Sequence, residues 1–115
     1  MADAHITIAV TNIARAGTAP TLGAADDVDG HRFPNDGRTF IFCINTAVAC
    51  TLTFQTPGTV DGLVVDDRDE VVPINAVGEF YGPFPPSIYN QSDGTVFIDV
   101  STETTCNLAA FRLPV

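Results

Sequence analysis

Three cysteines and two histidines are the residues of this chain that could supply a thiol nucleophile and its base. A thiol nucleophile needs a histidine base and a third group that orients the base. His5 falls in an N-terminal strand and His31 in a loop, and no nucleophile motif surrounds any cysteine. The thiols, at Cys43, Cys50 and Cys106, instead lie among phenylalanine and aliphatic residues, where cysteine behaves as a small hydrophobic residue. We therefore expect no enzymatic activity.

Cys43 and Cys50 flank the short connection 46–49, so a hairpin would place them opposite each other. Such a pair could form a cross-strand disulfide, although its geometry is usually strained. An odd number of cysteines fits a reducing compartment and free thiols. Because neither a Cys-x-x-Cys motif nor paired histidines occur, we expect no zinc site and no cofactor.

Acidic residues form two clusters that could attract calcium. Asp27, Asp29, Gly30 and Asp36 match positions three, five, six and twelve of an EF-hand loop. Position one is Ala25, however, position twelve lacks the longer glutamate, and no flanking helices are predicted. The second cluster, residues 66–70, is typical of a solvated turn. We expect no metal site, and calcium binding at either cluster stays an open alternative.

Four Asp-Gly pairs divide the chain into short β-branched and aromatic segments, at residues 29–30, 36–37, 61–62 and 93–94. Glycine adopts positive φ without a Cβ clash and aspartate bonds to the nearby backbone, so each pair predicts a tight turn at a strand boundary. No stretch keeps a helical period. The sequence therefore predicts an all-β fold of about eight short strands.

Alternation of apolar and polar residues indicates which strands line a core. The run 50–56 places Cys50, Leu52 and Phe54 on one face, as a sheet with one solvated face requires. The run 38–45 is apolar on both faces, which predicts a central strand or one whose outer face meets another subunit.

Two segments look like passages between sheets. The long connection 14–37 has little regular pattern, and such loops are usually functional or form interfaces. The segment 82–90 contains three prolines and predicts a rigid surface crossing that docks Phe84 and Ile88 into the core. These passages favour a two-sheet sandwich or a jelly-roll-like barrel. We interpret residues 1–115 as a single β-sandwich domain with an N-terminal arm at residues 1–12.

The charge balance excludes two classes of partner. The chain carries 14 acidic residues, five arginines and no lysine, for a net charge of −9. Duplex nucleic acid and anionic membranes both require clustered cations, which five scattered arginines do not provide.

No apolar run approaches the ~20 residues needed to span a bilayer, and the N-terminus lacks a signal-peptide pattern. We therefore expect synthesis in the cytoplasm.

Several turn and crossing segments resemble those of small structural proteins of tailed bacteriophages, and the likeness spans most of the chain. These segments are residues 31–40, 56–63, 67–68 and 82–90. In size and layout the chain is most similar to capsid decoration, or cement, proteins. That family braces the outside of an icosahedral head, often as trimers.

The resemblance implies a structural virion protein on the capsid exterior, whose partners are the major capsid protein and other copies of itself in a homotrimer. We expect the N-terminal arm to bind the capsid surface by adding a strand to it. The arm residues are Ala2, Asp3, Ala4, His5, Ile6, Ile8 and Val10. Contacts between copies are expected from the loop 17–36, namely from Asp27, Asp29, His31, Arg32 and Phe33.

The alternative is a receptor- or glycan-binding β-sandwich on a phage tail or head fibre. Glycan sites usually present exposed aromatic side chains that stack on sugar rings. The chain has no tryptophan, and its two tyrosines, Tyr81 and Tyr89, lie in the proline-flanked region. These features favour the decoration role over the fibre role.

Overall fold

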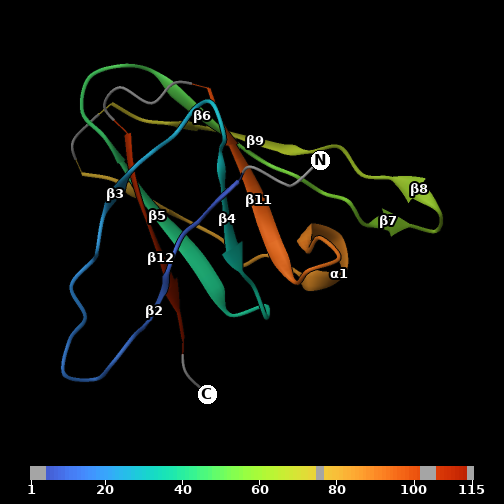
Figure 1. Ribbon diagram of the computed structural model, residues 1–115, viewed down its shortest axis with the longest axis horizontal. Coiled ribbons are helices and arrows are strands. Elements are labelled where there is room, and N and C mark those ends of the chain that lie inside the picture. Colours follow the sequence, from blue (N-terminus) through green and yellow to red (C-terminus); the bar gives the residue numbers. More distant parts are fainter. Residues whose placement is uncertain (1–4, 75–76, 102–105, 114–115) are drawn as a thin grey trace.

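A computed structural model of the chain describes residues 5–74, 77–101 and 106–113. Two main β-sheets pack face to face as a sandwich, with one four-residue helix at the side (Figure 1). This confirms the predicted all-β sandwich. Both sheets keep their edges, so the sandwich does not close into the barrel that the sequence left as an alternative.

The first sheet has five strands and contains the most regular alternation in the sequence. In spatial order they are β1 (Ile6–Thr7), β4 (His31–Pro34), β11 (Thr95–Val100), β6 (Cys50–Phe54) and β9 (Arg68–Val72). β1 runs parallel to β4, and the other neighbours are antiparallel. In β6 every second residue is buried, as the alternation over 50–56 predicted, and β11 shows the same pattern.

The second sheet is built around β5, which confirms the prediction of a central strand at 38–45. Its strands are β10 (Glu79–Tyr81), β5 (Thr39–Asn45), β12 (Cys106–Arg112) and β2 (Val10–Asn12), and β3 (Gly23–Ala24) also pairs with β12. β5 lies antiparallel to both β10 and β12. Its core-facing residues alternate with half-buried residues on the outer face.

A small hairpin projects from the sandwich between β6 and β9 (Figure 1). It consists of β7 (Thr59–Val60) and β8 (Leu63–Val64). Asp61 and Gly62 both have positive φ, 51° and 75°, as a type I′ turn requires. The other three Asp-Gly pairs also have glycine at positive φ, and β4, β5 and β11 begin at or soon after them. The predicted turn positions are confirmed.

The structure has more strands than the eight expected. The difference comes from short elements: β3 and β7 have two residues each, β4 has four, and the expected N-terminal strand is divided into β1 and β2. Two residues cannot display an alternating pattern, so β3 and β7 could not be recognised in the sequence. The helix α1 (Pro86–Tyr89) lies in the proline segment, and Phe84 just before it is buried, as predicted, whereas Ile88 is half-buried.

The connection 14–37 is less irregular than the sequence suggested, because it contains β3 and the interior strand β4. In β4, His31 and Phe33 point into the core and alternate with Arg32 and Pro34. This alternation was not recognised in the sequence, because it covers only four residues, ends in a proline and lies between two Asp-Gly pairs that are typical of loops. Residues 14–22 and 25–30 of this segment form loops, and residues 35–37 form the turn between β4 and β5.

The N-terminal segment also differs from the predicted arm. Residues 1–4 lie outside the described part of the chain. From His5 to Asn12 the backbone joins both sheets, because β1 pairs with β4 and β2 pairs with β12. The N-terminal strand expected around His5 is therefore divided into two strands that join different sheets, and residues 5–12 do not form a free arm.

Most connections pass from one sheet to the other, and this brings distant apolar residues into one core. Its largest fully buried side chains are Phe33, Phe54, Ile41, Leu52 and Ile98. The connection from β5 to β6 is one such crossing, so Cys43 and Cys50 lie in different sheets. The hairpin that would have placed these two cysteines opposite each other does not form.

Candidate functional site

An aromatic groove on the outer face of the second sheet is the most developed surface feature. It encloses about 730 Å³ and is lined mainly by apolar side chains, among them Phe40, Phe42, Phe80, Pro83, Phe111 and Leu113. Because Thr39, Ile41 and Cys43 of β5 face the core, the alternate residues Phe40 and Phe42 must face outward. The groove therefore lies on the side of the sheet away from the sandwich core.

Strand register brings four phenylalanines together in this groove. Phe111 of β12 is the direct neighbour of Phe40, and Phe80 of β10 is the direct neighbour of Phe42. The ring centroids of Phe40 and Phe111 are 5.7 Å apart, and those of Phe42 and Phe80 are 4.9 Å apart. Such cross-strand aromatic pairs stabilise a sheet. Phe80 nevertheless stays 66% exposed, so the cluster presents a large apolar surface to solvent.

One end of the groove is basic, which is unusual in a chain of net charge −9. Arg38 lines the groove, and Asp36 lies 3.0 Å from Arg38 and 3.5 Å from Arg112. The hydrogen bond from the Arg38 side chain is the main reason that the pKa of Asp36 lies below its ordinary value. Arg15 lies on the exposed turn between Ile13 and Thr18, which both line the groove.

The other end of the groove is closed by β10 and the residues that follow it. The Tyr81 hydroxyl donates a hydrogen bond to Glu79, at 3.0 Å. Burial, reinforced by this bond, raises the pKa of Tyr81 well above its ordinary value. Tyr81 is therefore a neutral hydrogen-bond donor at physiological pH and offers no acid–base chemistry.

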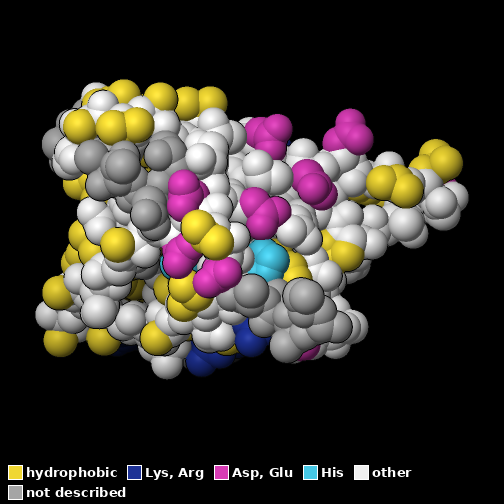
Figure 2. Space-filling model, turned by 45° about the horizontal axis from the view of Figure 1, so that its top comes forward, with side chains coloured by type: hydrophobic (Ala, Val, Ile, Leu, Met, Phe, Trp, Pro, Cys, Tyr) yellow, Lys and Arg dark blue, Asp and Glu magenta, His cyan; other side chains and the backbone are white. Residues whose placement is uncertain are grey.

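The β7–β8 hairpin is the second notable surface. All six of its residues are exposed, and Leu63 and Val64 are 71% and 84% exposed. Figure 2 shows hydrophobic side chains at the end of this projection. The Asp-Gly pair predicts this turn, but the exposure of the apolar residues on both sides of it was not recognised from the sequence.

The three thiols lie together at one place in the core, although they come from three strands. All are free and buried. The Sγ atoms of Cys43 and Cys106 are 2.9 Å apart. The hydrogen bond with Cys43, followed by burial, raises the pKa of the Cys106 thiol. A buried and protonated thiol is a poor nucleophile, so this cluster contributes packing.

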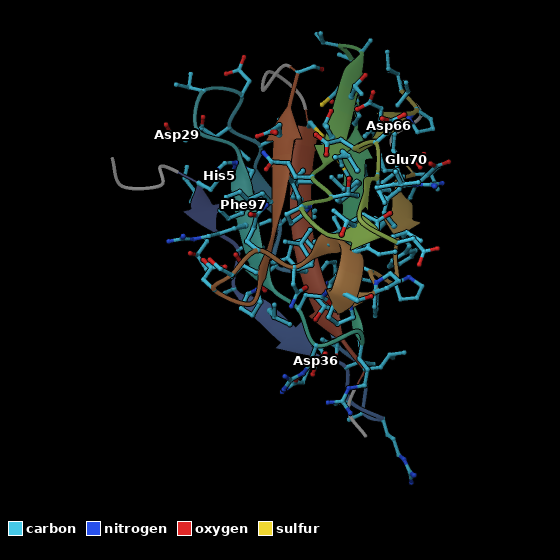
Figure 3. The ribbon with its side chains drawn as sticks, turned by 90° about the vertical axis from the view of Figure 1, so that its right-hand side faces the viewer. His5, Asp29, Asp36, Asp66, Glu70 and Phe97 are labelled. Carbon is cyan, nitrogen blue, oxygen red and sulfur yellow. The ribbon has the colours of Figure 1, made fainter. Side chains whose placement is uncertain are left out.

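The two histidines make separate, structural contacts. His5 stacks on Phe97, with ring centroids 4.1 Å apart, and its Nε2 lies 3.0 Å from Asp99 (Figure 3). The Nε2 atom of His31 accepts a hydrogen bond from the backbone N–H of Asp26, at 2.9 Å. This bond holds the turn that leads into β4.

The carboxylates that matched the EF-hand pattern do not gather in one loop. Asp29 and Asp36 lie at well-separated positions, and Asp66 and Glu70 lie on another side of the molecule (Figure 3). Asp26 instead accepts hydrogen bonds from the backbone N–H groups of Asp29 and Val28, which lower its pKa. Within the described ranges, no group of three or more histidine, cysteine or acidic side chains could hold a metal ion.

The residues predicted to form the capsid-binding arm are only partly exposed. Ala2, Asp3 and Ala4 lie outside the described residues. Ile8 and Val10 pack against the core, His5 is half-buried, and Ile6 is exposed on the edge strand β1.

The residues predicted to contact other copies are divided between the surface and the core. Asp27 is exposed, and Asp29 and Arg32 are partly exposed. The side chains of His31 and Phe33 are buried in β4. Phe33 is therefore unavailable for a contact between copies in this fold, because the alternation of β4 directs it into the core.

Acidification from pH 7 to about 5 is expected to lower the stability of the fold through His31. Burial lowers the pKa of His31 from its ordinary 6.5, and the carboxylate of Asp26 opposes this only in part. The unfolded chain therefore binds this proton at higher pH than the folded chain does. The contribution of neutral His31 to the stability of the fold is fully present above pH 6.5. It is lost as the pH falls through the lowered pKa of His31 in the folded state.

Thermal unfolding at several pH values measures this effect in the wild type and in His31→Gln, whose amide oxygen can still accept the Asp26 hydrogen bond. The glutamine variant should lose less stability between pH 7 and 5, whereas the control His5→Gln should keep the contribution of His31. If the stability of His31→Gln falls with pH as steeply as that of the wild type, His31 is not the group responsible.

Comparison with protein-family models, with curated proteins and with solved structures finds no match to this chain. Among the described residues, no helix is long and apolar enough to cross a membrane.

Proposed function

We propose that this chain is a structural virion protein that decorates and stabilises the outside of a tailed-phage icosahedral capsid, at junctions between major capsid subunits. It is made in the host cytoplasm and acts as a homo-oligomer, a trimer by analogy with the family that its turn and crossing segments resemble. The observation that carries the proposal is the amount of apolar surface on a small, highly charged sandwich. The aromatic groove and the β7–β8 hairpin are both exposed.

Three properties of the molecule support this role. A decoration protein needs a rigid body, and the core between the two sheets supplies one. It needs apolar patches that bind neighbouring subunits. The groove and the hairpin are candidates, because soluble monomers rarely expose large contiguous apolar patches unless these bind a partner. It also needs to stay soluble until it meets the shell, which a net charge of −9 favours.

The capsid contact is proposed for the N-terminal segment, now narrowed to the edge strand β1 and the residues before it. The N–H groups of Ile6 and Ile8 donate to the carbonyls of Gly30, which directly precedes β4, and Arg32, which lies in β4. Since backbone groups of a strand alternate in direction, the N–H of Thr7 points away from β4. An edge with free backbone groups can accept a strand from another protein.

The alternative role, glycan or receptor binding on a fibre, has weaker support. Sugar rings usually stack on exposed aromatic side chains. Tyr81 and Tyr89 are only partly exposed and pack against the core. Phe80 remains as an exposed ring, but it carries no polar group to bond a sugar hydroxyl.

Binding to purified undecorated heads tests the proposal. We expect wild-type protein to saturate at hundreds of copies per particle, counted by electron microscopy of the decorated heads. Heads that take up no protein would refute the capsid role. Saturation at a handful of copies would identify a fibre or tail component instead.

The same assay tests the edge strand with a matched pair of variants. Thr7→Pro removes the outward N–H without removing a bond to β4, whereas Thr7→Ala loses the same hydroxyl contact with Arg32 but keeps the N–H. Binding to heads should fall for the proline variant only. Equal binding of the two variants would exclude strand addition at β1.

A further inference from the structure

We propose that the β7–β8 hairpin of one copy inserts into the aromatic groove of a neighbouring copy. This inference rests on the self-association included in the proposed function, and it names the two surfaces that meet. It requires only free protein in solution, so its failure can be distinguished from a failure to bind heads.

The hairpin has the properties of a preformed insert. Two-stranded hairpins are at best marginally stable in water without packing, and residues 59–64 are all exposed. Its base is nevertheless held firmly. Thr56 donates from its hydroxyl to the Val65 carbonyl, at 2.6 Å, and from its backbone N–H to the Asp67 carboxylate, at 2.9 Å. The backbone N–H of Gly58 donates to the carbonyl of Ile88.

Apolar side chains extend to the end of this projection. Val60, Leu63 and Val64 are all exposed around the Asp61-Gly62 turn. Because the base is held by hydrogen bonds and the turn is tight, the hairpin loses less conformational entropy on binding than an open loop would, which favours its use as an anchor.

The groove is a matching receptor that the hairpin of the same copy does not fill. Residues 59–64 are absent from its lining. Its volume of about 730 Å³ is ample for a few aliphatic side chains, and its walls are phenyl rings and proline. Buried aromatic residues at the centre of a contact are typical anchors of protein interfaces.

Charge favours another copy of this chain as the occupant. The stretch 51–67, which contains the hairpin, carries Asp61, Asp66 and Asp67 and no cation. Arg38 lines one end of the groove, and Arg15 and Arg112 lie beside that end, where Asp36 is paired with both Arg38 and Arg112. Copies of a protein with a net charge of −9 repel one another, so a contact that brings the acidic hairpin to these arginines is favoured over contacts between acidic surfaces.

The arrangement also sets the type of assembly. Each copy offers one hairpin and accepts one, so contacts between unlike surfaces give a ring where the rotation between copies closes and a filament where it does not. The mass of the assembly at saturation gives the number of subunits.

Sedimentation velocity of three variants tests the contact. Leu63→Ser with Val64→Ser removes the apolar hairpin side chains, and Phe80→Ser removes the exposed ring of the groove. Each should weaken association by roughly tenfold or more, as expected for truncated anchor residues. Val28→Ser, at a residue that is 86% exposed and outside both surfaces, should associate as the wild type does. Circular dichroism checks that all variants stay folded.

Mixing the two defective proteins distinguishes this contact from other modes of association. The hairpin variant keeps an intact groove, and the groove variant keeps an intact hairpin. Together they should form a one-to-one complex that neither forms alone, and this complex should weaken with rising salt because the contact includes arginines and aspartates.

Three outcomes would overturn the proposal. The first is a wild-type protein that stays monomeric at all concentrations. The second is undiminished association of either the hairpin or the groove variant. The third is the absence of the one-to-one complex on mixing, which would indicate that like surfaces meet or that a different partner occupies the groove.

Discussion

Replacing Phe54 with alanine is expected to lower the free energy of unfolding by about 3–5 kcal/mol. Phe54 is 0% exposed and ends β6 in the middle of the core. Its ring packs against Phe84, with centroids 4.8 Å apart, and against Tyr81, at 6.1 Å. Truncation removes the contacts of this ring with the proline segment and with β10 of the second sheet, and it leaves a cavity in the core.

Urea denaturation of Phe54→Ala measures the loss, and Phe80→Ala serves as the matched control. Phe80 undergoes the same chemical change but is 66% exposed, so we expect a much smaller effect on unfolding. Since whole domains are stable by only about 5–15 kcal/mol, Phe54→Ala should be severely destabilised. Similar losses for the two variants would show that the core has been assigned to the wrong face.

Replacing Asn35 with alanine is expected to cost about 2–4 kcal/mol, because several buried hydrogen bonds disappear together. Asn35 is 7% exposed and lies in the turn between β4 and β5. Its Nδ2 donates to the carbonyl of Phe84 and to Oδ1 of Asn90, both at 2.8 Å, and its Oδ1 accepts from the N–H of Gly37. The loss leaves the Phe84 carbonyl and the Gly37 N–H without these partners.

Asn12→Ala is the control for this experiment. Asn12 is exposed and accepts one hydrogen bond, from Arg112, so its replacement should change stability by about 0.5 kcal/mol or less. The two variants are compared by urea denaturation, with the same slope of unfolding free energy against urea concentration used for both. A loss in Asn35→Ala no larger than that in Asn12→Ala would contradict the role of this turn as the anchor of the proline segment.

The candidate surfaces were only partly predictable. The apolar outer face of the run 38–45 indicated Phe40 and Phe42, because both alternate faces of that run carry apolar residues. It did not indicate Phe80 or Phe111, which reach the same face through pairing of β10 and β12 with β5. Those pairs join positions far apart in the chain, and no local pattern encodes them.

Short elements limited the prediction in a different way. β4 was hidden inside the predicted connection 14–37 because four residues with a proline show little alternation. The N-terminal segment alternates well at Ile6, Ile8 and Val10, yet its strands join different sheets. Alternation fixes which face of a strand is apolar but does not fix which neighbour the strand pairs with.

The sequence alone determined the all-β class, the four turns at Asp-Gly pairs, the inward face of β6, and the strongly acidic charge. These features depend on residue-by-residue backbone preference and on the two-residue period of a strand, which are local. Only the tertiary structure decided that Cys43 meets Cys106 rather than Cys50, that Asn35 bonds Asn90, and that four phenylalanines share one groove. Each of these contacts depends on strand order and crossings, which are set by how the whole set of apolar faces packs at once.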